Sequence, residues 1–502
     1  MGFLKKHWFI SIALGIAALF LFTRLYNILS VPIFTDEAIY IRWAQIAAND
    51  ASWRFISLTD GKQPMYVWIA MILMKFIEDP LIAGRMVSVL AGVVSMVGMY
   101  FLASETFRNK KIGLLASFLY VIYPFALVYD RLALYDSLVA MFMIWALYFE
   151  ILLIRHMRLD LALILGMIVG GGMLTKTSTD FALILLPFSL LLITERGKEF
   201  VLKTWKWTVF ALVVIVLANM IYSILRLSPY FHIIDDKNYV FIYPFSEWLM
   251  HPFTYLFGNL MGLGGWLTTY MTMPFLVLSA SSFFIGKKYL REKLLLLSWF
   301  IVPFIALAVF GRVIYPRFIL FMTMPLIVLG AYSLYRGATH IKKLWMQVIF
   351  VGVFTMMFFV TDFLILTNFV KAPIPQSDKS QFIAAWPSGV GVKETVAYLK
   401  EKAKDRKISV WTEGTFGLMP YALEIYLHDN PNIEIVGYWP VEDVAPKKLI
   451  ETSKKNPTYV IFYQPCAPCR VIGQAPPLWQ VKPVLEFTKL EPGSNYTLYQ
   501  VQ

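Results

Sequence analysis

Several charged side chains lie at the ends of long apolar runs in the sequence. Residues 34–40 follow such a run and contain Asp36, Glu37 and Tyr40, and Lys62 comes soon after them. Asp36 and Tyr40 are four residues apart, so they share one face if Asp36 opens a short helix. Such a group could accept a proton from a hydroxyl and bind an anion. In the plainer alternative Asp36 caps a helix, Glu37 faces water and Lys62 reaches a lipid headgroup.

Two further groups have the same character. Residues 129–136 contain Arg131 and Asp136, and Arg131 is close enough in sequence to pair with Asp130 or with another acidic partner. Lys176 lies in a polar hinge between two short apolar runs, where it either snorkels to the surface or meets an anion. For the group around Asp136, the plainer interpretation is a capped helix start with an exposed ion pair worth about 0–1 kcal/mol.

Arginines and one histidine complete the candidates. Arg312 and Arg317 lie at the start of a late apolar run, where they either bind phospholipid headgroups or clamp a phosphate. His232 and Asp235, with Asp236 beside them, could ligate zinc or manganese, because imidazole and carboxylate suit these metals. A single histidine beside solvated acidic residues is more often part of an ordinary loop, so a divalent metal is the weaker of the two interpretations.

The composition indicates what must position these side chains. Of the 502 residues, 58% are apolar and 15% are charged, whereas soluble domains carry about 25% charged residues. An ordinary cytosolic protein is therefore excluded, because the charges are too few to cover a soluble surface. The net charge is +13, but most basic residues lie in short clusters between apolar runs. That distribution indicates membrane topology and excludes nucleic acid as a partner.

Eleven apolar runs approach the length of about 17–25 residues that a helix needs to cross a bilayer. They are residues 8–28, 80–103, 112–129, 136–154, 159–174, 179–193, 205–225, 266–285, 294–310, 317–335 and 345–367. Residues 65–77 form a shorter run with Lys75 and are expected to be interfacial or re-entrant. Gly166 and Gly170 are expected to let two spans pack closely. The sequence thus predicts a polytopic α-helical membrane domain over residues 1–370.

The basic residues predict the orientation of these spans, because cytoplasmic loops are enriched in lysine and arginine. With Lys5 and Lys6 in the cytoplasm, the N-terminus and every second loop together hold 18 basic residues. These loops are residues 108–111, 155–158, 196–206, 287–293 and 336–343. The loops 32–79 and 226–252 and the C-terminal tail then lie outside the cytoplasm, as expected of an integral plasma-membrane protein.

The tail, residues 371–502, is predicted to fold as a soluble extracytoplasmic α/β domain, because helical periodicity alternates with β-rich runs. The predicted helices are residues 392–404, 416–427 and 447–455, and the predicted strands are residues 408–411, 433–438, 459–463 and 496–501. The tail also contains Cys466 and Cys469, which cannot complete a tetrahedral zinc site without a nearby histidine. A local disulfide is therefore favoured, and a thioredoxin-like redox role is the alternative.

In order and spacing, these groups resemble the membrane region of the protein O-mannosyltransferase and lipid A aminoarabinose transferase superfamily, whose members are GT-C fold glycosyltransferases. The matching segments are residues 35–40, 61–64, 85–92, 129–136 and 174–176. The resemblance covers residues 10–195 well and residues 200–370 only by topology. In one departure, Lys62 is followed by Gln63 and Pro64 where the family often has two prolines, which loosens the loop without removing the charge.

The resemblance implies transfer of a sugar from a polyprenyl-phosphate donor to an acceptor protein, lipid or glycan on the outer face of the membrane. By match, Asp36 is the base for the acceptor hydroxyl, and Lys62 contacts the donor phosphate. Asp136 matches a second aspartate that orients polar groups or the acceptor. The reaction would invert the anomeric centre in one displacement, and no cofactor is required.

Other residues receive roles from their positions beside these matches. Arg317 or Arg312 would be a second cation for the donor phosphate, and Lys176 would bind substrate. Arg131 would hold one of the catalytic carboxylates, and Glu37 and Tyr40 would line the pocket.

A transporter or a lipid flippase is the alternative from another class of protein. Such proteins place charges near the middle of the membrane on broken helices and often have repeated halves. In this sequence the charges gather at the outer ends of the predicted spans, and no half of the chain repeats the other. A glycosyltransferase embedded among membrane lipids is therefore favoured.

Overall fold

The computed structural model describes residues 8–286 and 288–502, so Lys5 and Lys6 lie outside the described residues. The chain divides into two compact units. The first, called here the helical unit, comprises the described residues up to Tyr26, Arg54–Tyr66 and Met86–Pro375. The second, called here the sheet unit, comprises Asn27–Trp53, Val67–Arg85 and Gln376–Gln502.

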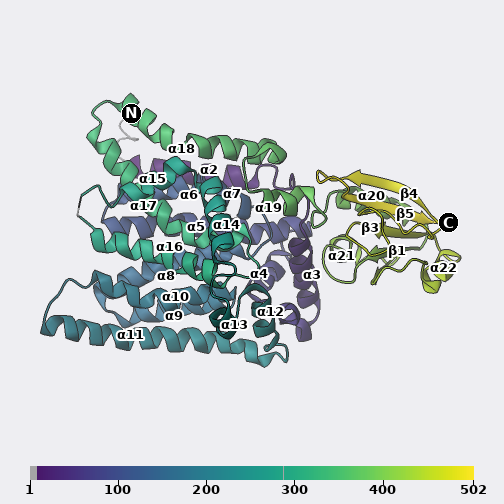
Figure 1. Ribbon diagram of the computed structural model, residues 1–502, viewed down its shortest axis with the longest axis horizontal. Coiled ribbons are helices and arrows are strands. Elements are labelled where there is room, and N and C mark those ends of the chain that lie inside the picture. Colours follow the sequence, from purple (N-terminus) through teal and green to yellow (C-terminus); the bar gives the residue numbers. More distant parts are fainter. Residues whose placement is uncertain (1–7, 287) are drawn as a thin grey trace. The chain divides into compact units, whose positions relative to one another are not determined.

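Seven helices of the described residues are long and apolar enough to cross a membrane. They are α2 (Trp8–Leu25), α5 (Pro80–Phe107), α8 (Asp136–His156), α11 (Lys198–Tyr222), α16 (Leu290–Phe310), α17 (Leu320–His340) and α18 (Leu344–Thr367). Figure 1 shows most of them running roughly side by side in a bundle. The predicted polytopic α-helical membrane protein is thereby confirmed.

The other four predicted spans are also helical, but they are shorter or interrupted. They correspond to α6 (Lys110–Val121) with α7 (Pro124–Tyr129), to α9 (Leu159–Met173), to α10 (Phe181–Leu185) between two 3₁₀ segments, η3 (Thr177–Asp180) and η4 (Leu186–Leu192), and to α14 (Leu256–Met271) with α15 (Met273–Ser281). Pro124, Pro187 and Pro274 each lie in the first turn of a helical segment. Proline lacks a backbone N–H and is tolerated there, so it separates successive pieces.

Glycines allow α9 and α11 to approach closely, as the sequence predicted. A Cβ atom added to Gly166 would lie 3.0 Å from Cβ of Leu217, and one added to Gly170 would lie 2.8 Å from Cβ of Ile221. Larger side chains at these two positions would push the helices apart.

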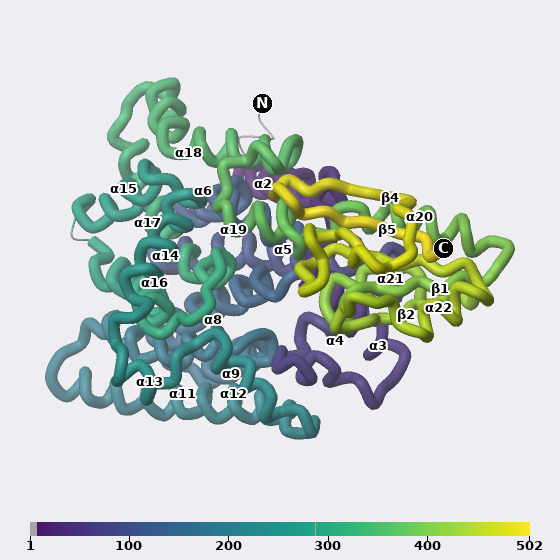
Figure 2. The backbone as a smooth tube through the Cα atoms, turned by 45° about the vertical axis from the view of Figure 1, so that its right-hand side comes forward, coloured from purple at the N-terminus to yellow at the C-terminus, as the bar shows by residue number. Residues whose placement is uncertain are grey.

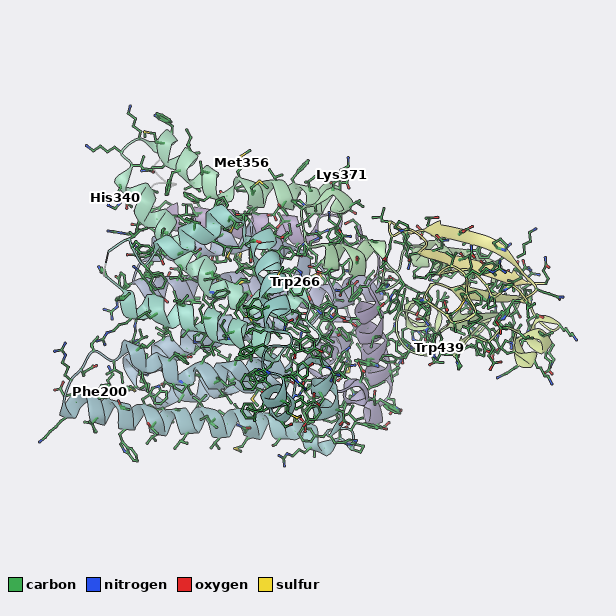
Figure 3. All side chains as sticks on the ribbon, in the orientation of Figure 1. Phe200, Trp266, His340, Met356, Lys371 and Trp439 are labelled. Carbon is green, nitrogen blue, oxygen red and sulfur yellow. A yellow bond between two sulfur atoms is a disulfide. The ribbon has the colours of Figure 1, made fainter. Side chains whose placement is uncertain are left out.

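Several basic loops meet at one end of the helical unit. Arg155 Nη1 lies 2.6 Å from Glu105 Oε1, and Arg155 Nη2 lies 3.2 Å from Glu292 Oε1, which joins the ends of three helices. Phe200, at the start of α11, and His340, at the end of α17, also lie at one end of the bundle (Figure 3). This arrangement agrees with the charge count, whereas the cytoplasmic assignment of this end stays a prediction.

The sheet unit contains a five-stranded sheet with the strand order β2-β1-β3-β5-β4. The strands are β1 (Ile408–Glu413), β2 (Ile433–Tyr438), β3 (Thr458–Phe462), β4 (Val481–Thr488) and β5 (Asn495–Val501), and the helices of the tail include α20 (Val392–Lys402), α21 (Tyr421–Leu427) and α22 (Lys447–Ser453). Strand β1 pairs in parallel with β2 and β3, and β5 pairs antiparallel with β3 and β4. The predicted α/β fold of the tail is confirmed.

Strand β4 is a strand of the tail that the sequence did not predict. It lies beside β5 at the edge of the sheet (Figure 2). Pro483 lies within it, and the pairing register shifts between Pro483 and Leu485. Proline cannot donate to a strand ladder and is therefore confined to edge strands and bulges, so Pro483 agrees with the place of β4 at the edge.

The sheet unit also contains α3 (Thr35–Asn49), which comes from the first long loop. Thr35 donates to the carbonyl oxygen of Pro387 from its backbone nitrogen at 3.1 Å and from Oγ1 at 2.9 Å. Arg42 forms an ion pair of 2.7 Å with Glu424 on α21. The helix that carries Asp36 is thus attached to the tail. The short helices α4 (Met65–Leu73), α12 (Ile233–Phe241) and α13 (Phe245–Met250) complete the elements used below.

Candidate active site

Helix α3 presents Asp36 and Tyr40 within its first two turns, as predicted. The helix begins at Thr35, so Asp36 lies in its first turn, where a negative charge is favourable. Asp36 is half-buried and Tyr40 is buried. The Tyr40 ring lies 5.9 Å from the ring of Trp43. The side chain of Asp36 is therefore partly accessible at the start of a helix whose next turn is buried.

Glu37 and Arg85 form a buried ion pair that fixes the start of α3. Arg85 Nε donates to Glu37 Oε1 at 2.8 Å and Arg85 Nη2 to Glu37 Oε2 at 2.9 Å, and both side chains are 0% exposed. Glu37 Oε2 also accepts from the backbone nitrogen of Phe34 at 2.9 Å. Arg85 further donates to the carbonyl oxygens of Ile28 and Val31. These contacts fix the first turn of α3, which carries Asp36, and the place of Glu37 in the lining of a pocket stays a prediction.

A second group of candidates meets in the helical unit, at the start of α8. Lys176 Nζ lies 2.8 Å from Asp136 Oδ1. Asp136 is 7% exposed and Lys176 is 29% exposed, so the lysine can still be reached by a ligand. The Lys176 ammonium also lies 4.5 Å from the ring centre of Phe318. Phe318 follows Arg317 in the 3₁₀ segment η6 (Pro316–Ile319), so Lys176, Asp136 and the segment with Arg317 come together.

The loop with Lys62 lies beside the hinge with Lys176. Gln63 Nε2 donates to Thr177 Oγ1 at 2.8 Å, and the backbone nitrogen of Met65 donates to the carbonyl oxygen of Leu174 at 3.0 Å. Two segments that are more than a hundred residues apart in sequence are therefore joined next to the two predicted lysines.

Asp60 joins Lys62 to a basic residue that the sequence analysis did not select. Asp60 Oδ2 lies 3.2 Å from Lys62 Nζ, and Asp60 Oδ1 lies 2.7 Å from Lys237 Nζ on α12. Gly61 between them has φ +66°, and a Cβ atom there would lie 2.5 Å from the carbonyl oxygen of Ile233. Only glycine fits this close approach of loop and helix. In the sequence, Lys237 could have been selected because it lies in the predicted outer loop of residues 226–252.

Lys62, Lys176, Lys237 and Arg317 are called the basic cluster below. Asp60 and Asp136 are the carboxylates paired with its lysines. The three lysines are each 22–29% exposed, and Arg317 is half-buried. Partly buried cations interact with an anionic ligand more strongly than the same charges do in bulk water.

Arg131 caps a helix in this structure. Its Nη1 donates to the carbonyl oxygens of Thr23, Arg24 and Tyr26 at 2.8, 3.2 and 2.7 Å, at the C-terminus of α2. That Arg131 holds a catalytic carboxylate stays a prediction. Arg24 Nε donates to Asp130 Oδ2 at 3.2 Å. Arg24 was missed although an arginine inside an apolar run is itself a signal of a buried polar interaction.

The remaining candidates are His232, Asp235 and Arg312. Among the described residues, Glu413 with Cys466 and Cys469 is the single close group of three potentially metal-binding side chains, but its two cysteines are joined in a disulfide, and it does not include His232 or Asp235. His232 Nδ1 lies 3.1 Å from the carbonyl oxygen of Pro229. Asp235 and Asp236 lie in the first turn of α12. Arg312 is exposed, with its guanidinium 5.6 Å from the ring centre of Tyr243.

Comparison with known proteins gives both a partial family match and structural neighbours. Residues 61–222 match the family model described as dolichyl-phosphate-mannose-protein mannosyltransferase. The crystal structure of ArnT from Cupriavidus metallidurans in the apo state is 14% identical, with 99% of this chain and 98% of that chain covered and a TM-score of 0.58. The same protein bound to undecaprenyl phosphate is 13% identical, with 98% of each chain covered and a TM-score of 0.55.

A third similar structure is the Archaeoglobus fulgidus oligosaccharyltransferase tethered with an acceptor peptide. It is 14% identical, with 92% of this chain and 70% of that chain covered and a TM-score of 0.54. No curated protein matches by sequence. These likenesses show that the chain has the GT-C fold, which the resemblance in its sequence had implied. Lys62, Asp136 and Lys176 lie within the matched family segment, and Asp36 lies before it.

Proposed function

We propose that this protein is a membrane glycosyltransferase that transfers a sugar from a polyprenyl-phosphate donor to an acceptor hydroxyl on the extracytoplasmic face. The observation that carries the proposal is the basic cluster, in which Lys62, Lys176 and Arg317 belong to loops at helix ends within an apolar bundle. A lipid-linked donor keeps its chain in the bilayer and offers a phosphate at the membrane surface, and the cluster offers the charge that such a phosphate needs.

Two similar proteins support the class of donor. ArnT from Cupriavidus metallidurans was solved with undecaprenyl phosphate, and archaeal oligosaccharyltransferase AglB from Archaeoglobus fulgidus was solved in complex with an inhibitory peptide and a dolichol-phosphate. For this chain we infer a donor of the same chemical class. The acceptor is a hydroxyl of a protein, lipid or glycan.

In the proposed reaction, the Asp36 carboxylate takes the proton of the acceptor hydroxyl while its oxygen attacks the anomeric carbon. The bond between that carbon and the phosphate oxygen breaks, and its electron pair leaves with the polyprenyl phosphate. The basic cluster stabilises the negative charge that develops on this leaving group. Because attack and departure occur on opposite sides of the carbon, the configuration inverts. Every step uses side chains alone, so no cofactor is required.

Asp136 has a positioning role in this proposal. Its carboxylate holds the Lys176 ammonium at 2.8 Å and so keeps that ammonium in place before the donor binds. Glu37 has the corresponding role for Asp36, because its ion pair with Arg85 fixes the first turn of α3.

Binding of undecaprenyl phosphate to the purified protein tests the basic cluster. We expect Lys176→Met and Lys62→Met each to weaken binding about tenfold or more, since a hydrogen bond to a charged group contributes about 1.5–3 kcal/mol. Lys203→Met is the matched control, because Lys203 is also partly buried and paired, at 2.7 Å with Glu195. Unchanged affinity in both cluster variants would contradict the proposed donor site.

A further inference from the structure

The loops after β1 and β3 form a second place in the fold where chemistry is favoured. Strand β1 is followed by α21 and by β2 on one side of β1, and the chain then returns to form β3 on the other side. In open α/β sheets, ligands bind outside the carboxyl ends of the strands at such a change of direction. Glu413 ends β1, and the loop after β3 carries Cys466 and Cys469.

The Glu413 carboxyl group is buried at this point with half of its hydrogen-bonding capacity in use. It is 1% exposed. Its Oε2 accepts from the backbone nitrogens of Tyr463 at 2.8 Å and Gln464 at 3.0 Å. Its Oε1 is buried and has no hydrogen-bond partner among the described residues. Burial raises the pKa of Glu413 to about 7, so at or below neutral pH this group holds a proton that it can give away.

Cys466 and Cys469 form a disulfide directly beside this acid, which confirms the favoured sequence prediction. A carboxylate oxygen of Glu413 and the two sulfur atoms all lie within 4.8 Å of one another, a separation that one water molecule can bridge. Both cysteines are half-buried, so a thiol from solution can reach the bond.

Stabilisation of the fold explains this disulfide poorly. The two cysteines are three positions apart, and a disulfide that closes so short a loop removes little entropy from the unfolded chain. Stabilisation does not explain the buried acid at all, because an unpaired carboxyl oxygen in the interior costs free energy. Such a group persists more readily where it takes part in a reaction.

We propose that the Cys466–Cys469 disulfide exchanges with external dithiols and that Glu413 is the proton donor for this exchange. A thiolate of the dithiol attacks one sulfur, the S–S bond breaks, and the electron pair passes to the other sulfur, which takes a proton from Glu413. The second thiol of the dithiol then displaces the first cysteine from the mixed disulfide. The dithiol leaves oxidised, the protein holds two thiols, and the protons released by the dithiol restore the acid and protonate the second cysteine.

The rate of reduction by dithiothreitol tests the proposal on the full-length protein in detergent. The chain has two cysteines, so each maleimide adduct observed by mass spectrometry reports this pair. We expect Glu413→Gln to reduce the rate constant, expressed per thiolate of the reagent, at least about tenfold at pH 6, because general acid catalysis typically contributes 10²–10⁴-fold. The amide oxygen of glutamine can still accept from Tyr463 and Gln464, so the fold is retained.

The pH profile separates proton donation from a structural effect. In the wild type, the rate constant per thiolate should fall as pH rises through about 7, because Glu413 then loses its proton, and in Glu413→Gln it should stay flat. The neighbouring titratable side chains are Tyr438 on β2 and Tyr463 after β3, and the pKa of each phenol is raised by burial, so both stay protonated over this range.

Glu434→Gln is the matched control, because Glu434 is exposed on β2 and should leave the rate unchanged. Equal rates for wild type and Glu413→Gln would overturn the proposal. A metal site would replace the proposed exchange if two results were found together. The reduced protein would bind stoichiometric Zn²⁺ in a way that depends on Glu413, and Glu413→Gln would leave the exchange rate unchanged.

Discussion

At the start of α3, the pair formed by Glu37 and Arg85 is the interaction on which the placement of Asp36 depends. Removing one partner of a buried ion pair leaves an uncompensated charge and costs about 3–5 kcal/mol. We therefore expect Arg85→Ala to lower the free energy of unfolding by that amount. Arg42→Ala is the control, because Arg42 and Glu424 are partly exposed and such pairs contribute about 0–1 kcal/mol. Denaturant unfolding in detergent measures the free energy of unfolding of both variants. Equal losses in the two variants would contradict the role of the pair of Glu37 and Arg85.

Glu413 makes the stability of the sheet unit depend on pH. Its pKa is raised from 4.5 to about 7 by burial, so folding favours its protonated form. Its contribution is therefore fully present below about pH 4.5 and is lost as pH rises through about 7, by an amount on the order of 3 kcal/mol. Thermal unfolding of the wild type and Glu413→Gln between pH 5 and 8 measures this. As the pH rises, the unfolding midpoint of Glu413→Gln should increase relative to that of the wild type. A difference that does not change with pH would contradict the raised pKa of Glu413.

The side chains of the site were predictable by type but not by partner. Asp36, Lys62, Asp136 and Lys176 were selected because charges at the ends of apolar runs are costly. The contacts of the site join distant segments: Lys176 lies 40 positions from its partner Asp136, and Lys237 lies 177 positions from Asp60. No local pattern links residues so far apart, because the fold brings them together.

At the scale of elements, the contact between α9 and α11 depends on glycine. We expect Gly170→Ala to destabilise the protein by about 1–3 kcal/mol, because its Cβ would lie 2.8 Å from Cβ of Ile221 and overpacking costs that much. Gly264→Ala on α14 is the matched control, since its Cβ would meet no atom within 4 Å and alanine favours a helix. Thermal unfolding in detergent compares the two variants. Equal midpoints would show that the close approach is not needed.

The spacing of apolar residues predicted most helices and strands, because the side chains on the buried face of an element recur with the repeat of that element. The exceptions have local chemical causes. The run at residues 112–129 is divided by Pro124, and β4 was missed because Pro483 lies within it. The glycines of α9 were predicted to pack closely, and Gly166 and Gly170 do so against α11.

In the whole molecule, we expect the basic loops and the tail to lie on opposite sides of the membrane. A cysteine introduced by Lys448→Cys on α22 should react with an impermeant maleimide in intact cells. One introduced by Lys198→Cys at the start of α11 should react only after permeabilisation. Both positions are exposed, so access depends on the compartment alone, and the wild type corrects for Cys466 and Cys469. The reverse labelling would contradict the orientation and the extracytoplasmic site.

Transfer from a defined polyprenyl-phosphate sugar by wild type and by Asp36→Asn tests whether Asp36 is the base of the proposed reaction. Asparagine keeps the shape of the side chain but cannot accept the proton of the acceptor hydroxyl, so the turnover number should fall about 10²-fold or more, with donor binding retained. Asp50→Asn is the control, because Asp50 is exposed at the C-terminal end of the same helix and should remain active. Full activity of Asp36→Asn would contradict Asp36 as the base and the reaction built on it.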